Sequence, residues 1–254
     1  MGKRFLHRWL CVLLLVAPCA SAETQLRLLT EDSPPMSFMR DGEPSGFSVE
    51  VVRALLARTG DRGRIELMPW TRAFHLAQQD ADIGLFSTVR IPEREGRFHW
   101  VGPIVVGTTS FYSLKSRGLV IDSLPQAAAS GPLALPKQWY TFEVLGSRGF
   151  TNLYGVSGPK QMMTLLKHGR VNLIATEDLT LAGELAVVDL KPQDVTAHVP
   201  FMRSAYYIAF SPQTSVVRVV RWQRALQQMH EDGSLEAILG RWLPHAPMPP
   251  LEQP

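Results

Sequence analysis

Short apolar segments alternate with helix-like segments over the first part of this 254-residue chain, and this alternation constrains the fold most strongly. Residues 26–30, 65–68 and 83–86 are apolar runs of the length expected for buried strands. Between these runs, residues 49–56 repeat apolar side chains at helical spacing, and residues 72–79 form a second helix-like stretch. Strands separated by helices predict a parallel α/β sheet with short crossovers.

The same alternation returns later in the chain. Strands and helices are predicted at residues 133–135, 139–145, 160–168 and 171–175. Two segments rich in Thr and aromatic residues, 107–114 and 205–210, are predicted to be extended. An α/β unit on either side of two extended segments indicates two lobes joined by two hinge crossings. Each lobe is expected to be a sheet flanked by helices.

The first 22 residues have the three parts of a secretory signal peptide. Lys3, Arg4 and Arg8 are the basic region, residues 10–17 are an unbroken apolar run, and residues 20–22 read Ala-Ser-Ala. The apolar run is shorter than the roughly 20 residues that a membrane-spanning helix needs. We therefore expect a periplasmic protein that begins at Glu23. Lipid attachment at Cys19 is the less favoured alternative, because Pro18 fits a lipoprotein cleavage site badly.

Composition excludes several functional classes. The signal holds three of the 26 Lys and Arg residues and none of the 23 Asp and Glu residues, so the exported chain is close to neutral. A balanced charge does not suggest nucleic-acid binding. The only cysteines, Cys11 and Cys19, lie in the signal, which excludes disulfides and thiolate metal sites from the exported chain. The sequence contains no P-loop, no HExxH and no GxSxG motif, so we predict no cofactor, metal or catalytic residue.

Several short motifs resemble, in order, those of the family 3 extracellular solute-binding proteins, which are periplasmic receptors for polar amino acids and related solutes. They lie at residues 30–38, 41–42, 46–50, 69–73, 82–83, 87–88, 91–95, 98–103, 169–173 and 230–238. The resemblance implies the type II periplasmic binding protein fold, in which a ligand is trapped when two lobes close. It suggests the following division: signal peptide 1–22, lobe 1 23–112, lobe 2 113–200, and a return to lobe 1 with the C-terminal helices at 201–254.

The resemblance also implies a site for a ligand that carries a carboxylate. Arg94 matches the carboxylate-binding arginine of the family, and an arginine can hold a carboxylate with two parallel hydrogen bonds. Ser87 and Thr88 are candidate hydroxyl donors at a strand end. Glu177 matches an acidic position that holds a ligand ammonium group, with the adjacent Asp178 as the alternative.

Aromatic side chains are expected to form the walls of this site. Trp70 is either a wall for the ligand stem or a core residue. Met36 stands where many relatives have an aromatic residue, and Phe38 or Trp139 could replace that ring. Residues 137–139 replace a more usual Gly-Ser stretch, and Lys137 changes the charge there.

These features predict a monomeric periplasmic binding protein that captures an amino acid or similar small polar solute. Its partner would be the membrane permease of an ABC transporter. An enzyme on the same fold, similar to cyclohexadienyl dehydratases, is one alternative, with Glu177 or Asp178 as the acid–base group. A ligand-sensing subunit is the other, because fold alone does not set function.

Overall fold

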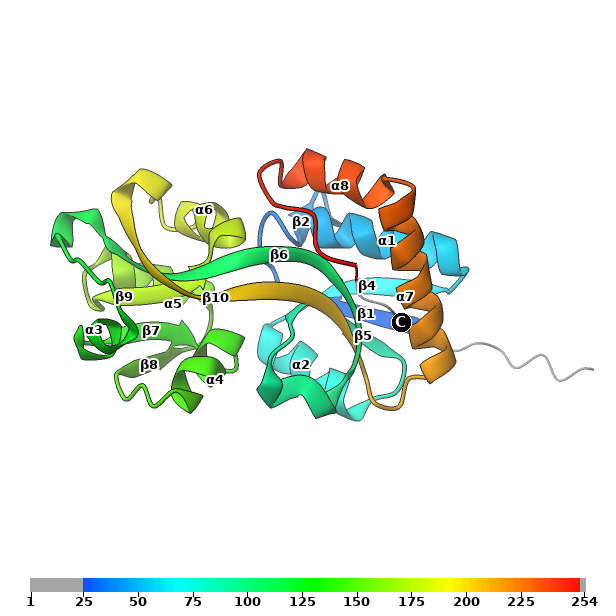
Figure 1. Ribbon diagram of the computed structural model, residues 1–254, viewed down its shortest axis with the longest axis horizontal. Helices are drawn as coiled ribbons and strands as arrows, with labels where there is room; N and C mark the ends of the chain where they lie inside the picture. The colour runs from blue at the N-terminus through cyan, green and yellow to red at the C-terminus, as the bar shows by residue number, and fades with distance from the viewer. Residues whose placement is uncertain (1–24, 252–254) are drawn as a thin grey trace, which may run out of the picture.

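A computed structural model describes residues 25–251, which form two lobes (Figure 1). The predicted signal peptide and Cys19 lie outside the described residues. None of the helices within residues 25–251 combines the length and the apolarity that a membrane crossing requires.

The first lobe follows the predicted alternation. Strands β1 (Leu26–Thr30), β4 (Gly63–Leu67) and β5 (Ile83–Val89) are separated by helices α1 (Phe47–Thr59) and α2 (Trp70–Gln79). β1 lies between β4 and β5 and is parallel to both, as predicted. A small hairpin of β2 (Phe38–Arg40) and β3 (Glu43–Ser45) precedes α1. The carboxyl ends of the parallel strands β1, β4 and β5 therefore meet at one edge of the lobe.

The second lobe repeats this architecture on a smaller scale. It contains α3 (Leu124–Ala129), β7 (Leu133–Pro136), α4 (Tyr140–Ser147), β8 (Leu153–Val156), α5 (Pro159–Lys167), β9 (Leu173–Glu177) and α6 (Asp178–Ala186). β7 lies between β8 and β9 and is parallel to both. Neither β8 nor α6 was predicted from the sequence.

Two strands of 16 residues each, β6 (His99–Leu114) and β10 (Val195–Phe210), run through both lobes. A strand of this length spans about 50 Å at roughly 3.3 Å per residue, which is enough to cross from one lobe to the other. They pair with each other along most of their length, while β10 also pairs with β5 and β6 with β9. One sheet of eight strands results, in the order β4-β1-β5-β10-β6-β9-β7-β8.

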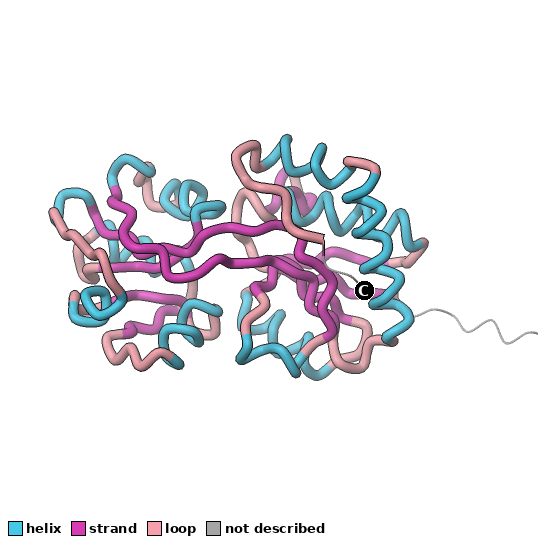
Figure 2. Tube along the Cα trace, viewed as in Figure 1, coloured by secondary structure: helices cyan, strands magenta, loops and turns pink. Residues whose placement is uncertain are grey.

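Figures 1 and 2 show these two long strands as the connection between the lobes. Both predicted extended segments lie within them, but each strand is longer than predicted. The boundaries suggested after residues 112 and 200 fall inside β6 and β10 respectively.

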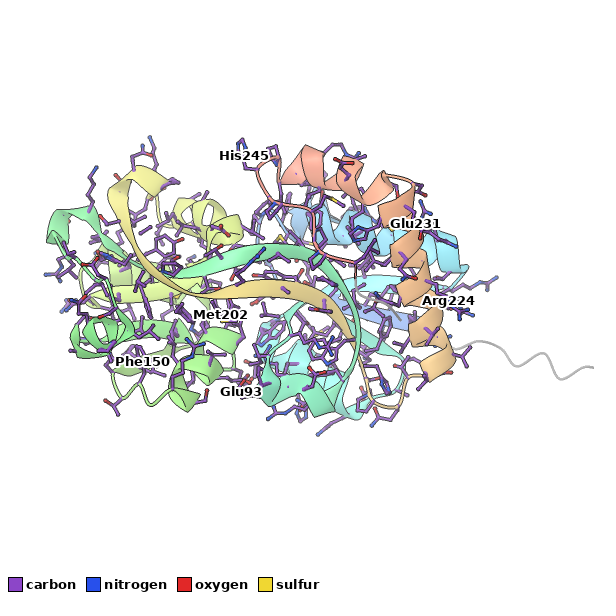
Figure 3. All side chains as sticks on the ribbon, in the orientation of Figure 1. Glu93, Phe150, Met202, Arg224, Glu231 and His245 are labelled. Carbon is purple, nitrogen blue, oxygen red and sulfur yellow. The ribbon has the colours of Figure 1, made fainter. Side chains whose placement is uncertain are left out.

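The C-terminal helices return to the first lobe. α7 (Val216–Glu231) and α8 (Ser234–Trp242) both pack against α1. Buried residues of α7 include Val219, Trp222, Leu226 and Met229, whereas Val216 is 59% exposed. Val216 is the first residue of the helix. Figure 3 shows Arg224 and Glu231 along the exposed side of α7.

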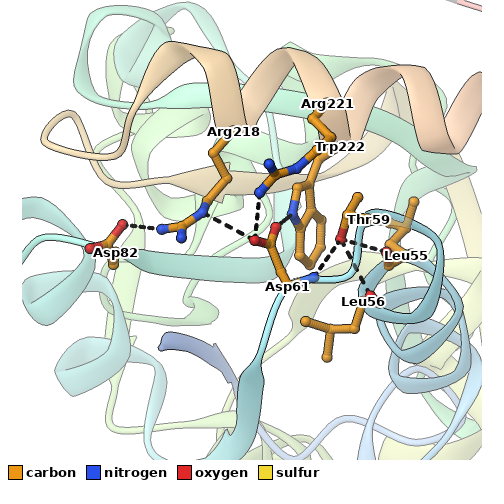
Figure 4. A network of polar contacts seen from close by, with 8 residues as sticks. All are labelled: Leu55, Leu56, Thr59, Asp61, Asp82, Arg218, Arg221 and Trp222. Atoms are coloured by element: carbon orange, nitrogen blue, oxygen red, sulfur yellow. Dashed lines mark hydrogen bonds and ion pairs between the residues drawn. The ribbon is translucent and has the colours of Figure 1, made fainter. Parts of the chain in front are cut away.

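A buried ionic network ties α7 to the loop before β4 (Figure 4). The Asp61 carboxylate accepts hydrogen bonds from Arg221 Nη2 and from Trp222 Nε1, both at 2.6 Å. Arg218 Nε lies 3.5 Å from the same carboxylate, and Arg218 Nη1 also pairs with Asp82. The Asp61 side chain is only 1% exposed, so this network is part of the interior of the lobe.

Candidate functional site

A small cavity of about 30 Å³ lies between the lobes. The first lobe lines it with Glu31, Ser33, Met36, Trp70, Ser87, Val89 and Arg94; the second lobe and β10 line it with Trp139, Tyr140, Glu177, Thr180 and Tyr206. This volume accommodates about one or two water-sized molecules. The structure is therefore a closed form, with side chains of both lobes in contact.

The strand ends explain why these residues meet. Glu31 directly follows β1, Ser87 lies near the end of β5, and Glu177 is the last residue of β9. Ligands of open α/β sheets bind outside the carboxyl ends of parallel strands. Here the strand ends of the two lobes face each other across the cavity.

Arg94 connects the two lobes. It lies in a 3₁₀ turn after β5, and its side chain is completely buried. Arg94 Nη2 donates to Glu143 Oε1 of α4 at 2.7 Å and to the Gln138 carbonyl at 2.8 Å, while Nε donates to Glu143 Oε2 at 3.3 Å. The Trp70 indole donates to the same Gln138 carbonyl at 2.9 Å. Three donors of the first lobe thus bind two residues of the second.

One donor group of Arg94 has no partner among the described residues. Arg94 Nη1 is buried and makes no hydrogen bond with the described residues. Ser87 Oγ is also buried and also lacks a hydrogen bond with them. Both residues line the cavity. Buried donors without an acceptor are costly, so a bound ligand that supplies acceptor oxygens here would be stabilised.

Glu177 lies across the cavity from these donors. Its carboxylate accepts hydrogen bonds from the hydroxyls of Tyr140 and Tyr206, and from Thr180 Oγ1 at 3.3 Å. Burial raises the pKa of Glu177 to about 7, although the hydrogen bonds from Tyr140 and Thr180 oppose the shift.

Two more carboxyls belong to the same cluster. Burial raises the pKa of Glu31 to about 8, and repulsion from Glu184 and Glu177 adds to the shift, while a hydrogen bond from Trp139 opposes it. Burial likewise raises the pKa of Glu184 to about 8, and Glu184 accepts hydrogen bonds from Thr176 and Thr180. Glu31 comes from the first lobe and the other two carboxyls from the second, so closure brings three acidic groups together.

The chain is matched over residues 26–245 by the family described as bacterial extracellular solute-binding proteins, family 3. It belongs to this family. It is 21% identical over 199 residues to the L-cystine-binding protein TcyA of Bacillus subtilis (strain 168), an alignment that covers 78% of this chain and 72% of TcyA.

Solved structures show the same fold as this family 3 protein. A histidine kinase sensor domain with similarity to periplasmic binding proteins matches with a TM-score of 0.80 at 18% identity, over 89% of this chain and 98% of that chain. A substrate-binding protein of an ABC uptake transporter from Streptococcus pneumoniae, with bound histidine, matches with a TM-score of 0.73 at 15% identity, over 88% and 94% of the two chains. These likenesses support the two-lobed fold implied by the sequence.

Six of the eight predicted site residues of this family 3 protein line the cavity. They are Met36, Trp70, Ser87, Arg94, Trp139 and Glu177. Two predicted residues do not line it. Thr88 is buried and donates to the Leu85 carbonyl at 2.8 Å, and the Phe38 ring packs edge-on against Trp242 with 5.9 Å between centroids.

The cavity also contains residues that the sequence analysis missed. Glu31, Tyr140, Thr180 and Tyr206 line it, but were not predicted. Glu31 had a detectable signal, since it is an acidic residue directly after the first predicted strand. Asp178, the alternative to Glu177, accepts a hydrogen bond from the Thr108 backbone at 2.9 Å and does not line the cavity.

The carboxyl cluster of this family 3 protein predicts a distinct pH dependence of stability. A carboxyl whose pKa is higher in the folded than in the unfolded chain keeps its proton in the folded state over that interval. The stability contributed by Glu31, Glu177 and Glu184 is therefore complete below about pH 4.5 and is lost as the pH rises through about 7 to 8. In the ligand-free protein, the melting temperature should fall from pH 5 to pH 8.5.

Glu184→Gln tests this assignment, because it removes one titrating group outside the cavity lining. The fall in melting temperature between pH 5 and pH 8.5 should be smaller in this variant than in the wild type. Glu236→Gln, on the exposed side of α8, is the matched control and should leave the slope unchanged. The same slope in all three proteins would contradict the assignment.

Proposed function

We propose that this protein captures an amino acid between its lobes and presents it to the membrane permease of an ABC transporter. The observation that carries the proposal is the placement of complementary groups across one cavity. Arg94 Nη1 and Ser87 Oγ are buried donors that find no partner within residues 25–251, and Glu177 is a buried carboxyl contributed by the second lobe. An amino acid supplies a carboxylate for the first pair and an ammonium group for Glu177.

Electrostatics couple ligand binding to closure in this proposal. Without a cation, closure brings Glu31 towards Glu177 and Glu184, and ionising these carboxyls is costly, so their pKa values rise to about 7 to 8. An ammonium group between these carboxyls stabilises their ionised form, and its binding energy favours the closed form. A ligand shifts such an equilibrium only by its differential affinity for the two forms.

The relatives support an amino acid as the ligand. TcyA is described as binding L-cystine, and the S. pneumoniae protein holds histidine and serves an ABC uptake transporter.

We further propose that residues 1–22 are a cleaved signal, so that a monomer beginning at Glu23 works in the periplasm. The proposed lobes remain 23–112 with 201–254, and 113–200.

A ligand screen by thermal unfolding tests the function. An amino acid at 100 times its dissociation constant should add about 2.7 kcal/mol to the free energy of unfolding. That corresponds to a rise of roughly 5–11 °C in melting temperature for a domain of this size. Polyamines lack the carboxylate and simple organic acids lack the ammonium group, so neither class should produce this shift at the same concentration. An equal shift with either class, or none with any amino acid, would contradict the proposal.

One observation favours a second candidate, an enzyme on the same fold. Glu177 has a pKa of about 7 and lies beside the Tyr140 hydroxyl, which suits a general acid–base group at neutral pH. Prephenate and arogenate are the substrates to assay. Turnover that disappears in Glu177→Gln would favour the enzyme, whereas stoichiometric amino-acid binding without turnover would favour the receptor.

A further inference from the structure

Glu143 of the second lobe is the counterion of Arg94 in the closed form. Its carboxylate accepts hydrogen bonds from Arg94 Nε at 3.3 Å and from Arg94 Nη2 at 2.7 Å, so both carboxylate oxygens contact one edge of the guanidinium. The Arg94 side chain is completely buried, and the Glu143 side chain is 22% exposed. An arginine holds the carboxylate of a ligand by the same two-point arrangement. The second lobe therefore supplies its own carboxylate to the arginine that the family resemblance assigns to a solute.

The contacts around this ion pair join the two lobes directly. Arg94 Nη2 and the Trp70 indole of the first lobe both donate to the Gln138 carbonyl of the second, at 2.8 and 2.9 Å. All of these donors and acceptors belong to the protein, so the bonds form whenever the lobes come together. We call Arg94, Trp70, Gln138 and Glu143 the interlobe latch. The pairing with Glu143 matters most, because a buried guanidinium without a counterion is costly.

The latched form leaves too little space for an amino acid. The cavity that Arg94 and Trp70 line has a volume of about 30 Å³, which is the space of one or two water molecules. Even the smallest amino acid has more heavy atoms than that. A solute that binds Arg94 and Ser87 must therefore hold the lobes further apart than the latch does. The latched form and the solute-bound form exclude each other.

We propose that Glu143 takes the place of a ligand carboxylate at Arg94, so that the ligand-free protein closes on itself and the latched form competes with solute binding. The competition rests on the proposed function, whereas closure of the ligand-free protein does not. When a ligand binds only one of two forms, its apparent affinity is reduced by the fraction of the protein in the binding-competent form. Weakening the interlobe latch should therefore raise the affinity for an amino acid.

Glu143→Ala tests the latch in the ligand-free protein. The closed form of this variant would bury Arg94 without a counterion, so the lobes should separate and the radius of gyration from small-angle X-ray scattering should exceed that of the wild type. Glu95→Ala is the matched control, because it breaks an ion pair with Arg90 that lies within the first lobe, and it should keep the wild-type radius. Trp70→Phe keeps an aromatic ring but loses the indole donor of the latch, so it should also expand the protein. A cooperative thermal transition shows that each variant is folded.

Calorimetric titration measures the competition, with L-arginine, L-glutamine and L-histidine as separate probes. A probe that binds the wild type should bind Glu143→Ala about threefold or more tightly, which corresponds to about two-thirds of the ligand-free wild type in the latched form. Glu95→Ala should keep the wild-type affinity.

Three outcomes decide between the latch and the proposed function. A radius of gyration that stays at the wild-type value in both Glu143→Ala and Trp70→Phe would overturn the latch and leave the proposed function intact. Weaker binding of a probe to Glu143→Ala than to the wild type would overturn the competition. An expanded Glu143→Ala that binds none of the three probes, like the wild type, would support the latch and count against the proposed function.

Discussion

Arg94→Ala should weaken the binding of an amino-acid ligand by roughly thirty- to several-thousand-fold. The side chain is completely buried in the closed form, and its Nη1 group faces no acceptor among the described residues. A ligand carboxylate at that position would form a charge-assisted contact shielded from water. Removing one partner of a buried charged pair typically costs about 2–5 kcal/mol, which gives this range at about 1.4 kcal/mol per tenfold change in affinity. Calorimetric titration with the amino acid that gives the largest thermal shift is the measurement.

Two further variants separate a binding role from a general charge effect. Arg94→Lys keeps the charge but loses the planar guanidinium, so it should also bind weakly. Arg97→Ala removes an exposed arginine from the same 3₁₀ turn and should bind like the wild type. Binding of Arg94→Ala within about threefold of the wild type would remove the main support for an amino-acid ligand. Thermal unfolding of the ligand-free variants shows whether each one folds.

Arg94 also shows how far a sequence can predict which residues line the cavity. Its match to the family motif was enough to select it, but its burial was not foreseen. The contacts that bury it include Glu143 and the Gln138 carbonyl of the other lobe, and the rings of Phe74 and Trp70 lie within 4.9 and 5.5 Å of its guanidinium carbon. Glu143 and Gln138 lie more than 40 positions further along the chain, so no local pattern around Arg94 could reveal them.

The same reasoning explains Glu31. Its type and its place after β1 were visible, but the raised pKa depends on burial against the second lobe and on Glu184 and Glu177. Phe38 packs against Trp242 instead of lining the cavity, and Thr88 stays out of the lining for a local reason. Successive side chains of a strand point to opposite faces, so Ser87 lining the cavity leaves Thr88 facing away from it.

Secondary structure was predictable wherever the apolar pattern is regular, as in β1, α1 and β5. Helix α6 was not, and Gly183 in its middle is one reason, since glycine disfavours a helix. The structure shows why glycine stands there. A Cβ atom at position 183 would lie 2.5 Å from the Pro34 carbonyl oxygen of the other lobe. The sequence lowers local helix propensity at this position because the closed lobes leave no space for a side chain.

Asp61→Ala should lower the free energy of unfolding by about 3–5 kcal/mol, the usual cost of removing one partner from a buried ion pair. The Asp61 side chain is 1% exposed, and the Arg218 side chain that lies against it is 6% exposed. Without Asp61, Arg218 keeps Asp82 as a partner, but the Trp222 indole and Arg221 lose the hydrogen bonds that they donate to Asp61 (Figure 4). For a domain of this size the melting temperature should fall by roughly 6–20 °C, as differential scanning calorimetry would measure.

Two further variants test whether the buried ionic network causes the loss of stability in Asp61→Ala. Glu50→Ala breaks an ion pair with Arg241 in which the two side chains are 34% and 58% exposed, and such surface pairs contribute less than about 1 kcal/mol. Arg218→Met in the Asp61→Ala background removes a side chain that is paired with Asp61 in the wild type, so the two losses overlap and the double variant should be more stable than the sum of the single effects predicts. Because neither Asp61 nor any residue of α7 lines the cavity, ligand affinity should stay at the wild-type value in any Asp61 variant that remains folded. A loss of stability no larger than that of Glu50→Ala would show that Asp61 acts as a surface residue and that α7 is held by its apolar face alone.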